Sequence, residues 1–185
     1  MADLFIALVH YPVLDRNARI VTSAITSLDL HDLARSARTY GVRRFFIVHP
    51  VAEQRAFATS VIGHWQEHPG RVFDSRRAEA LALAQVVGGL DEAIAIAETQ
   101  SGSPPTLVAT SARTSEGISY ESLRGKLDDS AGSPVLLLFG TGFGLAPEIM
   151  RRANLVLAPI RGVGDYNHLS VRAAVTAILD RLRGI

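Results

Sequence analysis

The sequence predicts an α/β fold, a single domain with a mainly parallel sheet and helices on both of its faces. Apolar runs of strand length alternate along the 185 residues with segments of helical spacing. Strands that alternate with helices form parallel sheets covered on both sides. A hydrophobic content of 48% with a net charge of +1 indicates a packed core and excludes disorder. No repeat or linker divides residues 1–185, so we expect one domain.

Three elements are expected before residue 50. The apolar run 4–9 predicts a strand, and residues 30–40 predict a helix that Gly41 ends, because glycine commonly follows a helix. Residues 44–48 predict the next strand. This strand–helix–strand order is the unit from which parallel sheets are built.

Two helices with a strand between them are expected next. Residues 50–68 predict a helix that begins at a proline and that Pro69 and Gly70 stop. Residues 83–87 predict a short strand. Residues 91–99 predict a helix, with the aspartate at its start as the N-cap.

The second half of the chain contains the most hydrophobic strand, at residues 135–139. A C-terminal helix is expected over residues 169–183, because its apolar residues fall on one face. The other elements expected here are strands at 106–110 and 155–157 and a short helix at 120–127.

Composition excludes several classes of protein. The chain has no cysteine, so we expect no disulfide, no thiolate zinc site and no cysteine nucleophile. Its apolar runs are too short to cross a bilayer. Asp3, and no basic stretch, precedes the first apolar run, which argues against a secretory signal. We therefore expect a cytoplasmic protein with no membrane partner.

The basic residues are almost all arginine, with 18 arginines and one lysine, Lys126. The planar guanidinium suits phosphate and stacks on bases, so this choice is compatible with a nucleic-acid surface. Codon bias is the simpler explanation, and the near-zero net charge favours it.

A glycine-rich segment follows the most hydrophobic strand. Gly140, Gly142 and Gly144 come directly after it, and Pro147 with Glu148 begins a helix. Glycines at the carboxyl end of a parallel strand let main-chain groups approach a ligand. The spacing differs from the dinucleotide fingerprint, and no Gly-Lys-Ser/Thr follows, which excludes a P-loop. On its own, the segment fits a tight strand-to-helix turn better than a ligand site.

A second glycine-rich loop, residues 157–170, joins a short strand to the C-terminal helix. Two such loops after neighbouring strands would form one cleft at the carboxyl edge of the sheet, where α/β proteins bind ligands. Asp165, Asn167, His168 and Ser170 cluster just before the helix. Ser170 or Asn167 could cap the helix, but four polar residues exceed what a cap requires.

A third polar cluster lies near the start of the first helix. Thr26, Ser27 or Asp29 fits an N-cap, and Asp32 and Arg35 have the spacing of a surface pair. His31 between them fits a solvated side chain better than a catalyst. Spacing alone leaves open whether this cluster has a function.

Residues 64–68 match the H-x-x-E-H pattern of a class of zinc proteases. His64 and His68 would share one helix face, but Pro69 and Gly70 end the helix at once and no supporting residues are evident. We expect a polar helix end here, and no metal site.

Taken in order, three segments resemble motifs of the SPOUT (α/β-knot) methyltransferases, which use S-adenosylmethionine to methylate RNA. Residues 30–42 are similar to the first motif of the TrmH-type ribose methyltransferases, and residues 139–148 to the second. Residues 158–174 are similar to the third, I-P-M-x-G…S-L-N-V-S-V-A-A, which is the most specific of the three.

The closest likeness is to a small bacterial branch found alone or fused behind a tRNA guanine-N1 methyltransferase. The shared segments are His10-Tyr-Pro, Leu28-Asp-Leu-His-Asp32, Ala109-Thr-Ser-Ala-Arg113 and Asp165-Tyr-Asn-His-Leu-Ser170. The resemblance implies a deep trefoil knot in the C-terminal half and a homodimer with its sites near the subunit interface.

The resemblance also implies a site. Arg35 would stabilise a ribose 2′-alkoxide or bind the adjacent phosphate. His168 would be the general base, with Asn167 beside it. The candidate RNA contacts are Arg113, Arg161 and Arg172. The residues expected to bind the cofactor are Thr110, Ser111, Gly140, Thr141, Gly142, Gly144, Leu145, Pro159, Ile160, Gly162, Leu169 and Ser170.

The chain departs from the TrmH-type pattern at three positions. Gly142 replaces a glutamate of the second motif, and Asp29 and His168 replace asparagines. We expect methylation of tRNA or rRNA, at a ribose 2′-oxygen in preference to a base nitrogen. The alternatives are a non-catalytic knotted RNA-binding or scaffold protein and a nucleotide-cofactor oxidoreductase. The absence of glycine after the first strand, residues 8–12, argues against the oxidoreductase.

Overall fold

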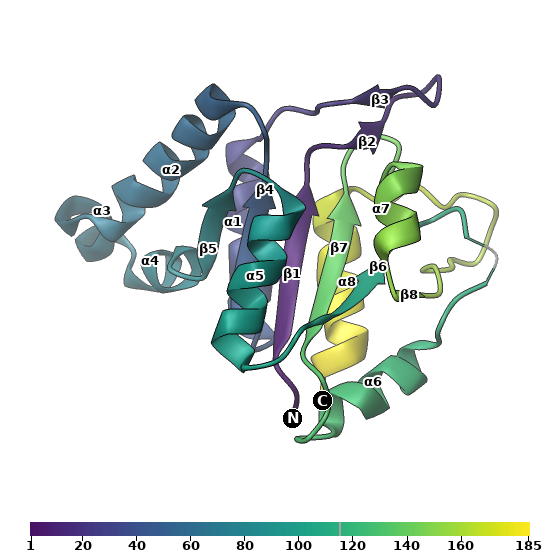
Figure 1. Cartoon of the computed structure of the whole chain (residues 1–185). Helices are drawn as coiled ribbons and strands as arrows, with labels where there is room; N and C mark the ends of the chain where they lie inside the picture. Colours follow the sequence, from purple (N-terminus) through teal and green to yellow (C-terminus); the bar gives the residue numbers. More distant parts are fainter. Residues whose placement is uncertain (115) are drawn as a thin grey trace.

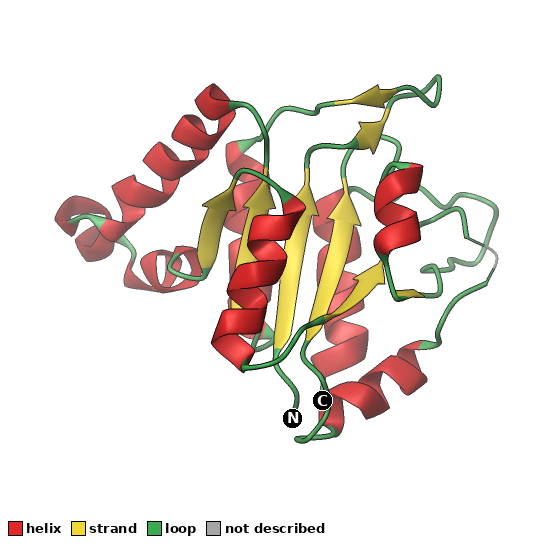
Figure 2. Ribbon diagram, in the orientation of Figure 1, coloured by secondary structure: helices red, strands yellow, loops and turns green. Residues whose placement is uncertain are grey.

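The computed structural model describes residues 1–114 and 116–185, and all of their side chains except those of residues 68 and 69. Its centre is a parallel sheet of six strands in the order β5-β4-β1-β7-β6-β8, with helices on both faces (Figures 1 and 2). The α/β prediction is therefore confirmed. The strands are β1 (Leu4–Val9), β4 (Arg44–Val48), β5 (Ala84–Val87), β6 (Thr106–Ala109), β7 (Val135–Gly140) and β8 (Leu155–Val156).

The helices form two layers. Those described are α1 (Ser27–Thr39), α2 (Ala52–Gln66), α3 (His68–Phe73), α4 (Ser75–Leu81), α5 (Leu90–Ser101), α6 (Tyr120–Asp128), α7 (Pro147–Arg152) and α8 (Val171–Arg183). Buried side chains of α1, α2, α4, α6 and α8 pack on one face of the sheet, and those of α5 and α7 on the other. Both faces are thus covered, which explains the uninterrupted apolar strands.

The core is built on β1, the strand that lies between β4 and β7. Leu4, Ile6 and Leu8 point into one cluster, and Phe5 with the other alternate residues into the second. Every residue of β1 is buried, so the strand must be apolar at each position. This requirement explains why the apolar run was recognisable in the sequence.

The helix expected over residues 50–68 is α2, and two further short helices, α3 and α4, follow it. The chain leaves helical geometry at Glu67 and resumes it at once. The prediction that Pro69 and Gly70 stop the helical structure was wrong, because Pro69 lies in the first turn of α3, where a helix needs no backbone N–H.

Two other boundaries differ from expectation. Gly89, not Asp91, is the N-cap of α5, and Asp91 lies in the first turn of that helix. The C-terminal helix begins at Val171, because the hydroxyl of Ser170 caps it by accepting a 3.3 Å hydrogen bond from the Ala173 N–H.

A short hairpin, β2 (Val13–Leu14) with β3 (Ile20–Val21), connects β1 to α1 and was not predicted. It lies over the loop that follows β7 (Figure 1), residues 140–146, which we call the glycine loop. The Phe143 N–H donates to the carbonyl of Leu14 at 2.9 Å, and the Leu14 N–H donates to that of Gly144 at 2.9 Å. The hairpin therefore braces the glycine loop.

In the part of the chain that the structure describes, no helix is both long and apolar enough to span a membrane. Among the same residues, no group of three or more histidines or carboxylates is arranged to hold a metal ion. The expectation for the H-x-x-E-H segment concerns His68, whose side chain lies outside the described ones.

Candidate active site

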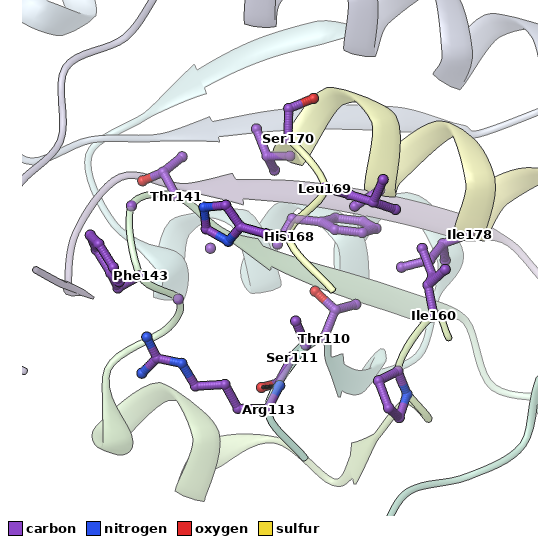
Figure 3. A pocket seen from close by; sticks show the side chains of 18 of the residues that line it. Thr110, Ser111, Arg113, Thr141, Phe143, Ile160, His168, Leu169, Ser170 and Ile178 are labelled. Atoms are coloured by element: carbon purple, nitrogen blue, oxygen red, sulfur yellow. Dashed lines mark hydrogen bonds between the residues drawn. The ribbon is translucent and has the colours of Figure 1, made fainter. Parts of the chain in front are cut away.

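A pocket of about 520 Å³ opens at the carboxyl edge of the sheet, beyond β6, β7 and β8 (Figure 3). Its volume lies in the range of small-molecule sites, and its position is where parallel α/β sheets bind ligands. Four stretches form its walls: residues 23–29, the β6 loop (residues 110–113), the glycine loop, and the C-terminal loop (residues 157–170) with the start of α8.

The two glycine-rich loops meet, but they do not follow neighbouring strands as we expected. β6 lies between β7 and β8 in the sheet. The pocket therefore spans the end of β6, and the β6 loop forms its middle wall. Strand order is set by tertiary pairing, so the spacing of the two glycine-rich loops could not place this wall, and only the family resemblance included its residues Thr110 and Ser111.

The glycine loop is a tight turn whose main chain lines the pocket. A Cβ on Gly140 would lie 2.6 Å from the Leu145 nitrogen, so no side chain fits there. Gly142 and Gly144 have φ values of +58° and +108°, which favour glycine. The segment is therefore the tight turn that its sequence favoured, and it also faces the pocket.

The β6 loop is tied to both of its neighbours. The Thr110 hydroxyl donates to the Leu138 carbonyl of β7 at 2.9 Å. The Asn167 amide donates to the Ala112 carbonyl at 3.1 Å, which joins the C-terminal loop to the β6 loop. Ser111 accepts the Arg113 N–H at 3.1 Å and fixes the turn from which the Arg113 side chain leaves.

The C-terminal loop contributes an apolar wall and one imidazole. Ile160 and Leu169 line the pocket together with Ile178 of α8. Figure 3 shows His168 pointing into the pocket toward Thr141. The Tyr166 ring, 81% exposed, meets the imidazole edge to face at a centroid distance of 6.4 Å.

A polar network connects the buried His10 to two half-buried residues of the pocket wall. His10 is fully buried, and its Nδ1 lies 3.0 Å from the hydroxyl of Ser23, which in turn contacts the hydroxyl of Thr141. Ser23 and Thr141 both line the pocket. Burial, reinforced by the nearby His49, lowers the pKa of His10 to about 4, so the imidazole is neutral.

His49 also binds the segment that contains Ser23. Its Nδ1 accepts the Val51 N–H at 3.1 Å, so Nε2 carries the proton and donates to the Ser23 carbonyl at 3.0 Å. The Ser23 N–H donates to the His10 carbonyl at 2.9 Å. Every polar group of Ser23 is therefore engaged, and this wall of the pocket is fixed.

Asp29, which is 6% exposed, places a carboxylate at the pocket wall. It accepts the Thr26 hydroxyl at 2.7 Å and Nη1 of Arg172 at 3.1 Å. Nε of Arg172 lies 3.3 Å from Asp32. Arg172 thus joins α8 to α1 through two carboxylates.

The structure brings most of the predicted residues together. Those that line the pocket are Thr110, Ser111, Arg113, Gly140, Thr141, Gly142, Gly144, Pro159, Ile160, Asn167, His168, Leu169 and Ser170. Leu145, a buried residue of the glycine loop, and Gly162 lie outside the lining. Arg35 is on the exposed side of α1, and Arg161 lines a shallower cavity with Arg181.

Sequence reasoning did not assign several lining residues to the site: Ser23, Ala24, Asp29, Phe139, Phe143, Ala174 and Ile178. Phe143 could have been noticed, because a large aromatic residue between two glycines is unusual in a turn. Ser23 had no such signal, since its partners are distant in the sequence.

The fold and the pocket define an α/β protein with a pocket of small-molecule size at the carboxyl edge of its sheet. Residues 3–184 match a family model described as SAM-dependent RNA methyltransferase. The chain belongs to this family, which confirms the resemblance found in its motifs and makes S-adenosylmethionine its cofactor.

Relatives of known sequence agree. The chain is 41% identical over 182 residues to a tRNA (guanine-N(1)-)-methyltransferase from Oleidesulfovibrio alaskensis, covering 98% of this chain and 42% of that protein. The chain thus spans about two fifths of that relative. It is also 41% identical over 181 residues to an uncharacterized protein from Aquifex aeolicus, covering 97% of this chain and 88% of the relative.

A solved structure shares the fold. The SpoU methyltransferase AviRb from Streptomyces viridochromogenes, solved with the cofactor AdoMet, superimposes with a TM-score of 0.59 at 21% identity, covering 97% of this chain and 56% of that one.

The pocket has the features that S-adenosylmethionine requires. The close approach at Gly140 leaves main-chain groups free of side chains. Ile160, Leu169 and Ile178 offer an apolar wall for a nucleobase, and the hydroxyls of Thr110 and Ser111 offer hydrogen bonds. This mixture of apolar surface and few polar groups fits a nucleoside cofactor.

Proposed function

We propose that this protein transfers the methyl group of S-adenosylmethionine to tRNA or rRNA in the cytoplasm, and that the acceptor is a ribose 2′-hydroxyl. The observation that carries the proposal is the convergence of the glycine loop, the β6 loop and the C-terminal loop on one pocket, in a chain of this family. The TrmH-like motifs favour ribose over base.

The cofactor residues follow from the pocket. Main-chain groups of the glycine loop, the Thr110 and Ser111 hydroxyls and the C-terminal loop would hold the cofactor, with Leu145 and Gly162 shaping the two loops. When bound, the cofactor supplies a methyl group on a positively charged sulfur, which is a strong electrophile. The protein then has to align the acceptor and remove its proton.

His168 is the proposed base, because its imidazole projects into the pocket and is open to solvent. Asn167 positions it by holding the C-terminal loop on the β6 loop. Arg35, outside the pocket lining, is assigned to a phosphate of the RNA. Arg113 and Arg161 are further RNA contacts. Arg172 would have to leave Asp29 and Asp32 to reach RNA, so we assign it mainly to holding α8.

We also propose that residues 1–185 form one domain with a deep trefoil knot in the C-terminal half, and that two copies form a homodimer. The fold likeness to a SpoU methyltransferase supports the knot. The TrmH-like motifs support the dimer.

The test is transfer of tritiated methyl groups to bulk tRNA and rRNA from cells in which the gene is disrupted, followed by nucleoside analysis. We expect label in one RNA class, on a ribose 2′-oxygen. Such a nucleotide is recognised because its 2′-O-methyl group protects the adjacent phosphodiester bond from alkaline cleavage. Label on a base would overturn the ribose assignment, and no label in either RNA would overturn the function.

Gly140→Ala tests the site itself. The added Cβ would collide with the Leu145 nitrogen at 2.6 Å, so we expect cofactor binding by calorimetry and methyl transfer to fall about 100-fold. Gly125→Ala in α6 is the matched control, because its Cβ would meet no atom within 4 Å. Equal behaviour of the two variants would contradict the proposed cradle.

A further inference from the structure

Phe143 is an exposed aromatic ring on a rigid support. It lines the pocket and is 43% exposed, between Gly142 and Gly144. Its N–H donates to the Leu14 carbonyl at 2.9 Å, and the Gly144 N–H donates to the Thr141 carbonyl at 3.0 Å. Since the main chain is held on both sides, the ring is presented at the pocket mouth by a braced turn.

A cation accompanies this ring. Cζ of Arg113 lies 5.9 Å from the Phe143 ring centroid (Figure 3), within the range of a cation–π contact. Within residues 1–114 and 116–185, no carboxylate forms an ion pair with Arg113. The pocket mouth therefore combines an aromatic face with an uncompensated positive charge.

We propose that Phe143 and Arg113 form a subsite that holds a nucleobase of the RNA, the base stacking on the phenyl ring and the guanidinium contacting the adjacent phosphate. This inference rests on the proposed function. Proteins hold unstacked RNA bases on aromatic rings and arginine planes, and an acceptor nucleotide must leave its own stack to enter a pocket.

The charge of the subsite favours RNA over the cofactor as its occupant. S-adenosylmethionine carries a net positive charge, which Arg113 repels, whereas the RNA backbone is anionic. Ile160, Leu169 and Ile178 offer the cofactor's nucleobase an apolar wall elsewhere in the pocket. The Phe143 ring is thus left for a base of the substrate.

The test compares Phe143→Ala, Phe143→Leu and Phe143→Tyr in methyl transfer to the RNA class that the wild-type protein labels. Loss of one stacking ring should raise KM for RNA about 10- to 100-fold in the alanine variant. The leucine variant should resemble alanine and the tyrosine variant should lose least, because stacking needs an aromatic face. Cofactor affinity by calorimetry should stay within about twofold.

Phe57→Ala is the matched control, since Phe57 on α2 is 42% exposed and lies outside the pocket lining. Its KM for RNA should equal that of the wild type. If the leucine variant has the same KM for RNA as the tyrosine variant, the base does not stack on the ring and the proposal is wrong. If Phe143→Ala binds the cofactor more weakly than the wild type, the ring contacts the cofactor and the proposal is also wrong.

Photocrosslinking separates this inference from the proposed function. Bulk cellular RNA containing 4-thiouridine should crosslink to the peptide that includes Phe143, in the presence of S-adenosylhomocysteine. If the wild-type protein transfers no methyl group but this crosslink forms, the proposed methyl transfer is wrong and the proposed nucleobase subsite is supported. No crosslink there would overturn the subsite.

Discussion

His10, which is buried, and Ser23, which is half-buried, show how single polar residues set the pocket wall. Their side chains are hydrogen-bonded although they lie 13 residues apart, and the contact from Ser23 to Thr141 spans 118 residues. Periodicity and motif spacing carry no information about such partners. His10 was therefore found only as part of a shared family segment, and Ser23 not at all.

The buried imidazole of His10 makes folding depend on pH. The folded protein holds the pKa of His10 at about 4 against an ordinary 6.5, so below pH 6.5 an unfolded chain binds a proton that the folded one does not. We expect the free energy of unfolding to fall between pH 6.5 and 4, by up to about 3 kcal/mol from this residue. Urea unfolding across this range measures it.

His31 and His49 also have lowered pKa values, because of burial, and add to the same trend. The contribution of His10 is therefore read from His10→Gln, whose free energy of unfolding should depend less on pH than that of the wild type. Identical pH profiles for both proteins would contradict a buried, neutral His10.

At the scale of elements, polar contacts join α1 to α8 along their length. Arg172 bonds Asp29 at one end, and the Tyr40 hydroxyl donates to Asp180 at 3.0 Å at the other. Between them the hydroxyls of Ser36 and Thr176 lie 2.7 Å apart. These contacts fix the start of α8, where Ser170 lines the pocket.

Removing the cation from this junction should destabilise the fold. Arg172→Met leaves the carboxylate of Asp29, 6% exposed, without its ion pair, so we expect the free energy of unfolding to fall by about 1–2 kcal/mol. Asp29→Asn combined with Arg172→Met should cost less than the two changes separately. Asp32→Asn, at a side chain 49% exposed, should cost least. Strict additivity in a denaturant-based double-mutant cycle would contradict the pairing.

The elements that sequence predicted best are those whose environment is simplest. β1, β4 and β7 are almost wholly buried, and α8 has one apolar face, so their patterns are plain. The β2–β3 hairpin has only two residues in each strand and is held by the glycine loop. No local pattern encodes an element that exists because of a distant partner.

At the scale of the whole molecule, the pocket results from strand order. The two glycine-rich loops were expected to form one cleft because of their place at the carboxyl edge of the sheet, and the family resemblance added residues of the β6 loop. That β6 separates β7 from β8 depends on pairings between residues far apart in the sequence. The Phe143–Arg113 pair follows from this order, because it joins the loop after β7 to the loop after β6.

The proposed homodimer predicts a particle of about twice the 19.9 kDa of the chain. Light scattering coupled to size-exclusion chromatography measures this mass. We expect it to hold on tenfold dilution, since an interface that completes a site has to persist at working concentrations. A mass of one chain throughout would contradict the dimer.

The central position of β1 has a consequence for synthesis on the ribosome. Once residue 87 has emerged, β4 can pair with β1 and β5 with β4, but the other edge of β1 pairs with β7, which ends at Gly140. A nascent chain of intermediate length therefore presents a bare, wholly apolar strand edge, a template for unwanted association between chains. Chaperone demand during translation should peak in that interval and end when β7 docks.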